Sequence, residues 1–253
     1  VGIDGIVSVF AGGRFVEDYQ PFGDGGPAKQ ARLGRQLAGL GGVAVDTQGN
    51  VYISDTSNHR IRRVDSNGII STFAGSGDGG PFMGGFSGDG GPATLARLNA
   101  PMGLAVDAKG TVYIADSGNN RVRRVSLDGT ISTFAGSGGA GGFSGDGGSA
   151  TQATLNTPNS VAVDAKGNVY IADGRNFCVR RVSPDGIIRT IAGRRPAGYS
   201  GDGGSATNAG FRELQGVGVD AKGNVYIADT DNGRIRRVEI EKSLSPLNVQ
   251  QRR

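Results

Sequence analysis

Short apolar runs alternate with turns rich in glycine and aspartate along most of the chain, and they recur as a unit. A run of β-branched and aromatic residues ends in aspartate at four places, residues 51–55, 112–116, 169–173 and 225–229. Another aspartate stands nine residues before each of these closing aspartates, after a second apolar run. The closing aspartates are 61, 57 and 56 residues apart, which indicates one structural unit used four times.

Each unit predicts four short strands. In the second unit the expected strands are residues 103–106, 111–115, 121–125 and 130–135, separated by the turns DAKG, DSGNN and LDG. Aspartate can bond its own backbone in such turns, and glycine supplies the positive φ. Strands joined by short turns form an antiparallel meander. No helix of ten residues fits between them, which argues against parallel βαβ units.

A longer connection links one unit to the next, and each copy contains the letters GDGG followed by alanine-rich sequence. Pro27 and Pro92 occupy positions where a first helical residue would stand, which proline tolerates. Alanine and leucine or phenylalanine then recur at short spacing. We therefore expect one or two helical turns laid on the edge of the next sheet.

The two ends of the chain are complementary. The last unit, residues 216–238, has three predicted strands, whereas residues 5–12 (GIVSVFAG) form a fourth strand with no unit before it. Pairing the first strand with the last sheet would close a ring and remove the exposed edges. We therefore predict four radial sheets, with residues 239–253 as a tail. The alternative is a piece excised from a larger propeller.

The repeated motifs G-V-A-V-D, G-N-V-Y-I-A-D, N-x-R-I-R-R-V and G-x-I-x-T-x-A-G resemble the NHL repeat. The resemblance covers nearly the whole chain, and the GDGGPA linkers are similar to those of bacterial members. It implies a β-propeller, and the four repeated units with the complementary ends predict an all-β fold of four NHL-type four-stranded antiparallel blades, closed by the N-terminal strand. The propeller would span residues 1–238, with units beginning near 41, 102, 159 and 216. The fold carries binding modules and enzymes alike, so it does not decide the function.

Composition narrows the function classes. Glycine is 47 of 253 residues, there is a single cysteine, and no apolar run approaches the length of a membrane span. The net charge of +4 gives only a modest attraction to anionic partners. The single histidine, His59, excludes a multi-histidine metal site within this chain. The resemblance to glycine-rich bacterial NHL arrays, which are often exported, implies a secreted or periplasmic bacterial protein.

The third strand of each unit carries arginines that would form a repeated basic band in a closed ring. This band predicts binding of a polyanion, either nucleic acid or an acidic polysaccharide. The competing interpretation is that the guanidinium groups pair with the aspartate turns, since 27 basic residues nearly balance 23 acidic ones. The representative residues of the band are Arg62, Arg123, Arg180 and Arg236.

The aspartates that close the second strands could have either of two roles, as metal ligands or as turn residues. A ring of carboxylates near an axis could hold calcium, and the resemblance implies that some six-bladed relatives use such a site in a lyase or hydrolase. Identical use in all four units favours the alternative, a turn aspartate that caps backbone N–H groups. We expect no cofactor, with calcium as the alternative. The residues concerned are Asp55, Asp116, Asp173 and Asp229.

The third unit and the linker after it break the repeat. Arg175, Phe177, Arg194 and Arg195 replace more regular residues, so a specific ligand site is expected near them. We predict a non-enzymatic binding or scaffold module for a protein or carbohydrate partner. Polyanion binding through the arginine band is the alternative, and a calcium-dependent lyase or hydrolase is the second alternative.

Overall fold

The computed structural model describes residues 5–13, 23–34, 39–76, 84–194 and 196–239. Its strands form antiparallel sheets, each a simple meander. The first sheet comprises β1 (Val43–Val45), β2 (Val51–Asp55), β3 (Arg60–Val64) and β4 (Ile70–Ala74). The second comprises β5 (Pro101–Val106), β6 (Val112–Asp116), β7 (Arg121–Val125) and β8 (Ile131–Ala135). We call them blades 1 and 2.

Blades 3 and 4 repeat this plan, but the last is shorter. Blade 3 comprises β9 (Pro158–Val163), β10 (Val169–Asp173), β11 (Cys178–Val182) and β12 (Ile188–Ala192). Blade 4 has three strands, β13 (Leu214–Val219), β14 (Val225–Asp229) and β15 (Arg234–Val238). The predicted all-β class and antiparallel meanders are confirmed. Among the described residues blade 4 has no fourth strand, because β15 pairs only with β14 there.

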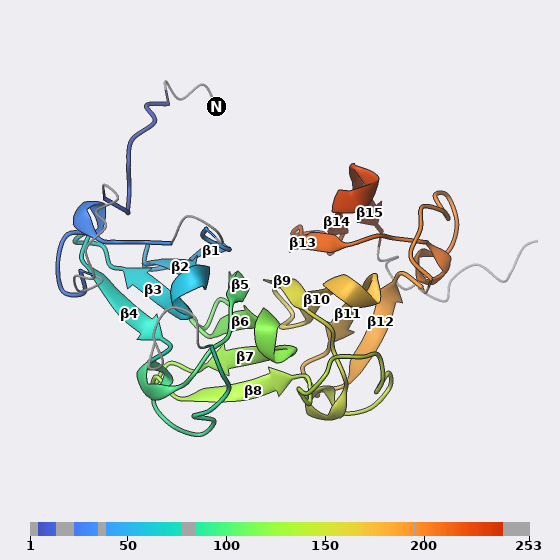
Figure 1. Ribbon diagram of the computed structural model, residues 1–253. Helices are drawn as coiled ribbons and strands as arrows, with labels where there is room; N and C mark the ends of the chain where they lie inside the picture. Colours follow the sequence, from blue (N-terminus) through green and yellow to red (C-terminus); the bar gives the residue numbers. More distant parts are fainter. Residues whose placement is uncertain (1–4, 14–22, 35–38, 77–83, 195, 240–253) are drawn as a thin grey trace, which may run out of the picture.

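The blades stand side by side in an open arc, with their first strands facing the inside (Figure 1). Neighbouring first strands approach closely where the chain has small residues. The Gly42 N–H donates to the Met102 carbonyl across blades 1 and 2 (2.8 Å). A Cβ on Gly103 would stand only 2.5 Å from Ser160 Cα of blade 3. Small side chains at this position therefore set how closely consecutive blades pack.

The hydrophobic core is divided among the spaces between blades. One cluster joins β3 and β4 of blade 1 to blade 2, a second joins blades 2 and 3, and a third joins blades 3 and 4. Each repeat buries its apolar face only by packing against its neighbours, as in other repeat proteins. The apolar residues of the predicted strands thus pack in interfaces between blades rather than in one central core.

The linkers form short 3₁₀ helices on the outer edge of the sheets, as the sequence predicts. They are η1 (Ala28–Gln30), η3 (Ala93–Leu95), η5 (Ala150–Gln152) and η7 (Ala206–Asn208). In the linker before blade 2, the Gly90 N–H donates to the Ile131 carbonyl of β8, and the Ala93 N–H donates to the Gly129 carbonyl (2.8 and 2.9 Å). The linkers before blades 1, 2 and 3 therefore cover the outer strand of the blade that follows them.

Tight 3₁₀ turns also join the second and third strands of every blade. They are η2 (Thr56–Asn58), η4 (Ser117–Asn119), η6 (Gly174–Asn176) and η8 (Thr230–Asn232). Each ends in a left-handed residue, which is His59 in blade 1 and Gly233 in blade 4. The left-handed residue turns the chain back antiparallel.

The predicted closure of the ring is not formed in the structure. Residues 5–10 carry no strand, and Ile6, Val7, Val9 and Phe10 are exposed. The N-terminal segment extends from blade 1, at the end of the arc opposite blade 4 (Figure 1). Because the interfaces between blades fix the angle between neighbours, four blades do not bring the two ends together. The predicted tail beyond Glu239 lies outside the described residues.

Candidate functional site

A buried guanidinium lies between two carboxylates in every blade. In blade 2, Arg123 contacts Asp89 from the preceding linker (2.6 Å) and Asp116 from the end of β6 (3.6 Å). Blade 3 repeats this with Arg180, Asp146 and Asp173. The other two blades have the same arrangement, Arg62 with Asp24 and Asp55 and Arg236 with Asp202 and Asp229. The GDGG aspartate and the closing aspartate thus share one cation in each blade.

The closing aspartates also cap backbone groups of the linker. The buried Asp116 carboxylate accepts hydrogen bonds from the Asn99 N–H (2.7 Å) and from Asn119 Nδ2 (2.8 Å). Burial raises the pKa of Asp116 to about 6, although these bonds and Arg123 oppose the rise. The carboxylate therefore acts as a structural acceptor that fixes the linker to the blade.

This geometry bears directly on the predicted arginine band. Three of the four guanidinium side chains are fully buried and the fourth nearly so, and all four are paired with aspartates. A polyanion could reach them only by breaking those ion pairs. The structure thus agrees with the competing interpretation of pairing with the aspartate turns, and it does not favour polyanion binding by Arg62, Arg123, Arg180 and Arg236.

The proposed metal ligands are similarly engaged. Asp55, Asp116, Asp173 and Asp229 lie in four different blades, and each accepts hydrogen bonds from an asparagine side chain and a backbone N–H. Among the residues that the structure describes, no three histidine, cysteine, aspartate or glutamate side chains are grouped to hold an ion. These four carboxylates do not converge on a common point.

The residues that break the repeat lie near the junction of blades 3 and 4. Arg175 and Arg194 are exposed, and Phe177 packs partly buried against the core of that junction. The Phe177 carbonyl lies against Gly193, which precedes Arg194. Phe177 and Arg194 are thus brought near each other, whereas Arg195 lies outside the described residues.

Phe177 also stands where blades 1 and 2 have a side chain that accepts a hydrogen bond from the next unit. His59 Nδ1 accepts a hydrogen bond from the Ala100 N–H (2.9 Å), and Asn120 Oδ1 accepts one from the Thr157 N–H (2.8 Å). Phenylalanine cannot accept such a bond. The single histidine therefore ties blade 1 to the following linker.

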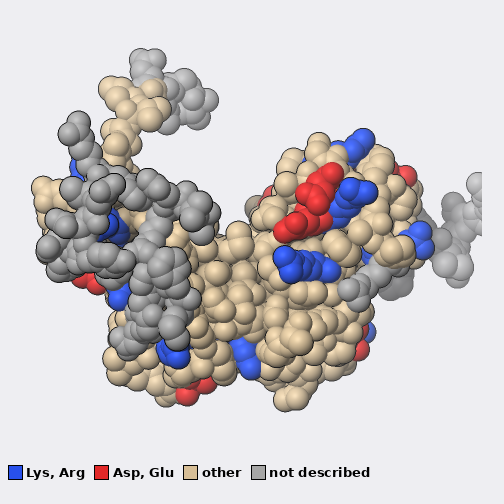
Figure 2. Space-filling model, in the orientation of Figure 1, with Lys and Arg blue, Asp and Glu red and all other residues tan. Residues whose placement is uncertain are grey.

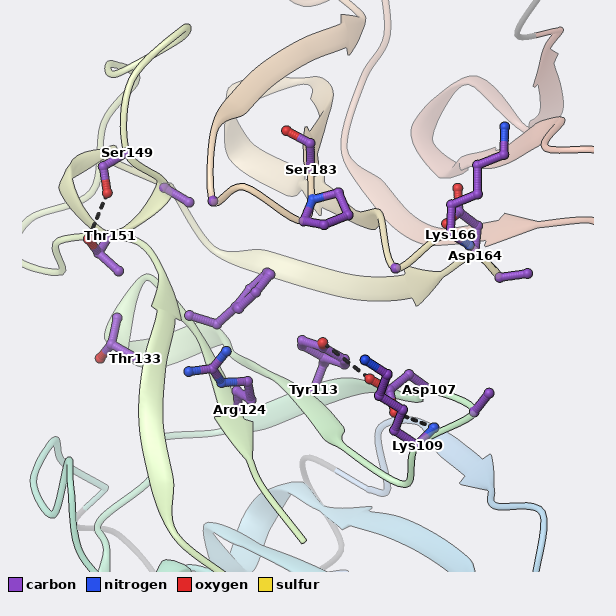
Figure 3. Close-up of a pocket in the computed structure, with 17 residues that line it drawn as sticks. Asp107, Lys109, Tyr113, Arg124, Thr133, Ser149, Thr151, Asp164, Lys166 and Ser183 are labelled. Carbon is purple, nitrogen blue, oxygen red and sulfur yellow. Dashed lines mark hydrogen bonds between the residues drawn. The ribbon is translucent and has the colours of Figure 1, made fainter. Parts of the chain in front are cut away.

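A cavity of about 520 Å³ lies between blades 2 and 3 (Figure 3). Its walls come from the first turns of both blades, from β6, β7 and β8 of blade 2, from the last turn of blade 3, and from the start of η5, where Ser149 and Thr151 lie. Tyr113 and Phe134 form an edge-to-face pair with ring centroids 4.9 Å apart. We call this cavity the interblade groove.

The carboxylates of the interblade groove are held by their own turns. Asp107 accepts hydrogen bonds from the Lys109 N–H (2.9 Å) and from Tyr113 Oη (3.4 Å), both visible in Figure 3. Burial would raise the pKa of the Asp164 carboxyl, but hydrogen bonds from Asn168 and its neighbours outweigh burial and lower it. Both carboxylates are therefore held as hydrogen-bond acceptors by their own turns.

The cations of the interblade groove are more accessible. The side chains of Lys109, Arg124 and Lys166 are exposed, and Arg124 lies over the Phe134 ring at 5.9 Å. Sequence reasoning missed these residues. The available signal was the lysine repeated in the DAKG turns of neighbouring units, but nothing in the sequence shows that two such turns face one groove.

The surface offers no continuous basic band on the face that Figure 2 shows. Charged side chains are scattered over a mostly uncharged surface, and basic and acidic groups gather together on the last blade. This mixed distribution follows from the near balance of 27 basic and 23 acidic residues. No helix in the described part of the chain is long and apolar enough to cross a membrane.

Comparison with known families matches almost the whole chain. The sequence model of the teneurin NHL domain matches residues 11–80, 78–141 and 140–198, and that of the NHL repeat matches residues 211–238. Teneurin-1 of Mus musculus is 30% identical over 252 residues, which is 91% of this chain and 9% of that protein. Teneurin-m of Drosophila melanogaster is 30% identical over 210 residues, 76% of this chain and 8% of that protein. The chain spans less than a tenth of these curated relatives.

Solved structures support the fold. A protein of unknown function from Bacteroides thetaiotaomicron aligns with a TM-score of 0.61 and 23% identity, covering 83% of this chain and 50% of the other. An auxiliary nutrient binding protein from the same organism aligns with a TM-score of 0.61 and 18% identity, covering 83% and 48%. At these identities the likeness concerns the fold alone. Sequence motifs, meander blades and family matches agree, and the chain belongs to the NHL-repeat family.

Proposed function

We propose that the chain is a non-enzymatic binding module whose partner is a protein segment rich in carboxylates. The observation that carries the proposal is the interblade groove. Its aspartates are satisfied by their own turns, while Lys109, Arg124 and Lys166 are exposed around it. The unsatisfied charge of the groove is therefore positive, which suits an acidic segment.

The groove favours a protein segment over a carbohydrate. Sugar recognition would need an open aromatic face, but Tyr113 is buried and Phe134 is partly covered by Arg124. The buried arginines and the closing aspartates are paired with each other, so the proposal rests on the groove rather than on those residues. We expect the module to act outside the cytoplasm, secreted or periplasmic; this expectation and the bacterial origin rest on sequence character alone.

The test is selection of binders from a random displayed peptide library, alongside a glycan array. We expect acidic peptides to be enriched on the chain. The variant Lys109→Glu/Arg124→Glu/Lys166→Glu should weaken them by about tenfold or more, because three attractive charges become repulsive. Fluorescence polarisation measures the change in Kd.

The matched control is Lys222→Glu. Lys222 occupies the DAKG turn of blade 4, at the position that Lys109 occupies in blade 2, but it lies outside the groove. Binding should persist in this variant. Equal loss in both variants would show an unspecific charge effect, and selection of sugars instead of peptides would overturn the choice of partner.

A further inference from the structure

A single exchange between repeats distinguishes the wall of the interblade groove that blade 2 provides. The residue immediately before the second strand is Asn50 in blade 1, Asn168 in blade 3 and Asn224 in blade 4. Blade 2 has Thr111 at this position. Three repeats therefore have a side chain that ends in a primary amide, where blade 2 has a shorter side chain that ends in a hydroxyl.

The asparagine of blade 1 joins two charged groups. Asn50 Nδ2 donates to Asp46 Oδ2 (2.7 Å), and Asn50 Oδ1 accepts a hydrogen bond from Arg63 Nη2 (2.9 Å). The asparagines of blades 3 and 4, Asn168 and Asn224, also donate to the aspartates of their own turns, both at 2.8 Å. In blade 1 one primary amide thus serves a carboxylate with its donor and a guanidinium with its acceptor.

Thr111 leaves the corresponding groups of blade 2 without this amide. Asp107 Oδ1 accepts bonds from two backbone N–H groups, as in the other blades. Asp107 Oδ2 receives only a long bond from Tyr113 Oη (3.4 Å) among the described residues, whereas the tyrosine bonds of blades 1 and 3 are 3.1 Å. Arg124 is exposed and makes no hydrogen bond within the described part of the chain, whereas the equivalent Arg63 is half-buried. An acceptor and a guanidinium therefore remain available.

Both available groups lie on the groove side of blade 2. Tyr113 pairs with Arg124 across β6 and β7, so their side chains share one face of the sheet. Figure 3 shows Asp107 and Arg124 to either side of the Tyr113 ring, and all three residues line the groove. Burial raises the pKa of the Tyr113 hydroxyl, the charge of Asp107 adds to the rise, and Arg124 opposes it. The carboxylate and the guanidinium thus act on the same hydroxyl.

We propose that the interblade groove binds a primary amide, the side chain of an asparagine or glutamine in its partner, between Asp107 and Arg124. This inference rests on the proposed function, because the exposed lysines of the groove select the acidic segment that carries the amide. The bound amide donates to Asp107 Oδ2 and accepts from Arg124. Its two bonds copy those that Asn50 makes with Asp46 and Arg63.

The chemistry of the two groups selects a primary amide over the other groups of a peptide. A carboxylate has no hydrogen to donate to Asp107 and is repelled by it. A trans peptide bond directs its N–H and its C=O to opposite sides. A primary amide carries one hydrogen on the same side as its oxygen, so it presents a donor and an acceptor next to each other.

The turn of blade 3 that lines the groove lacks such a site. Asp164 Oδ2 already accepts hydrogen bonds from Asn168 Nδ2 (2.8 Å) and from Tyr170 Oη (3.1 Å). Lys109 and Lys166, one from each turn, are exposed and face the carboxylates of the segment. The groove therefore selects a segment in which acidic residues flank one asparagine or glutamine.

Matched peptides separate the amide from the charge. Four repeats of Glu-Asn and four repeats of Glu-Ala carry the same negative charge, and fluorescence polarisation with the full chain measures both Kd values. We expect the Glu-Asn peptide to bind about fivefold more tightly, because the amide adds two hydrogen bonds of modest net strength. Equal affinities would overturn the amide site and leave the acidic-segment proposal standing. If neither peptide binds, both proposals fail.

Thr111→Asn supplies the amide from within the chain. Asparagine occupies this position in the other three blades, so the fold accommodates it, and unchanged thermal unfolding verifies this. We expect the Glu-Asn peptide to fall to the affinity of the Glu-Ala peptide. The control Thr207→Asn makes the same exchange in η7, outside the groove, and should keep the difference of about fivefold. A difference that persists in Thr111→Asn would contradict the proposal.

A crystal structure of the Thr111→Asn variant without peptide provides the second test. The introduced side chain should donate to Asp107 Oδ2 and accept a hydrogen bond from Arg124, as Asn50 does with its partners in blade 1. If the introduced amide does not bridge these two groups, blade 1 is no guide to recognition in the groove, and the proposal is refuted.

Discussion

The buried arginines show that the contribution of an arginine to stability depends on how deeply its side chain is buried. Arg123 and Arg124 are adjacent on β7, yet the first is buried between Asp89 and Asp116 and the second is exposed. Removing one partner of a buried ion pair leaves a charge without compensation, whereas an exposed arginine contributes little. The adjacent pair therefore provides an internal comparison.

We expect Arg123→Met to lower the free energy of unfolding by about 3–5 kcal/mol, because the Asp116 carboxylate would remain buried without its cation. Arg124→Met should change it by less than about 0.5 kcal/mol. Urea unfolding followed by circular dichroism measures both. Equal, small effects would mean that the buried cluster does not stabilise the blade.

At the scale of elements, the linkers before blades 1, 2 and 3 fasten the outer strand of the blade that follows. Asp89 receives Arg123 from the third strand and Thr133 from the fourth, so one carboxylate joins linker and sheet. In blade 4 Tyr199, which belongs to the linker itself, takes over the second bond to Asp202. The same acceptor is thus satisfied by a different element.

Thr133→Val and Tyr199→Phe should each cost about 0.5–1 kcal/mol of unfolding free energy, since each removes one exposed hydrogen bond to a carboxylate. Both replacements are nearly isosteric, and phenylalanine already occupies the Tyr199 position in blades 2 and 3. Urea midpoints measure the loss. If only Thr133→Val is destabilising, Tyr199 does not hold Asp202 in solution.

For the whole molecule, the approach of consecutive first strands sets the shape of the arc. Gly103 allows blade 2 to lie against blade 3, where any added carbon would contact the Ser160 backbone. The same position in blade 4, Gly216, faces no following blade. A substitution at these two glycines therefore separates packing between blades from effects within a strand.

Gly103→Val should lower the unfolding free energy by about 2–3 kcal/mol, because overpacking forces blades 2 and 3 apart. In the dilute chain, Gly216→Val should leave stability unchanged or slightly raise it. Thermal unfolding at low protein concentration measures both variants. Comparable losses would show that the cost arises within the strand and not between blades.

The sequence by itself determined the features that depend on residues close together along the chain. The alternation of apolar residues predicts strands, the aspartate and glycine turns predict where they reverse, and Pro27 and Pro92 indicate the short helical turns of the linkers. Each of these features depends on residues a few positions apart. The pairing of arginines with aspartate turns could also be weighed from composition, as one of two interpretations.

Only the tertiary structure decided which charges are buried and where the surface is hollow. Asp89 and Arg123 are 34 residues apart, and the interblade groove combines turns from two blades, so no local pattern contains either. The predicted closure failed for the same reason. Complementary sequences at Phe10 and β15 show that the ends could pair, but the packing angle between blades determines whether they meet within one chain.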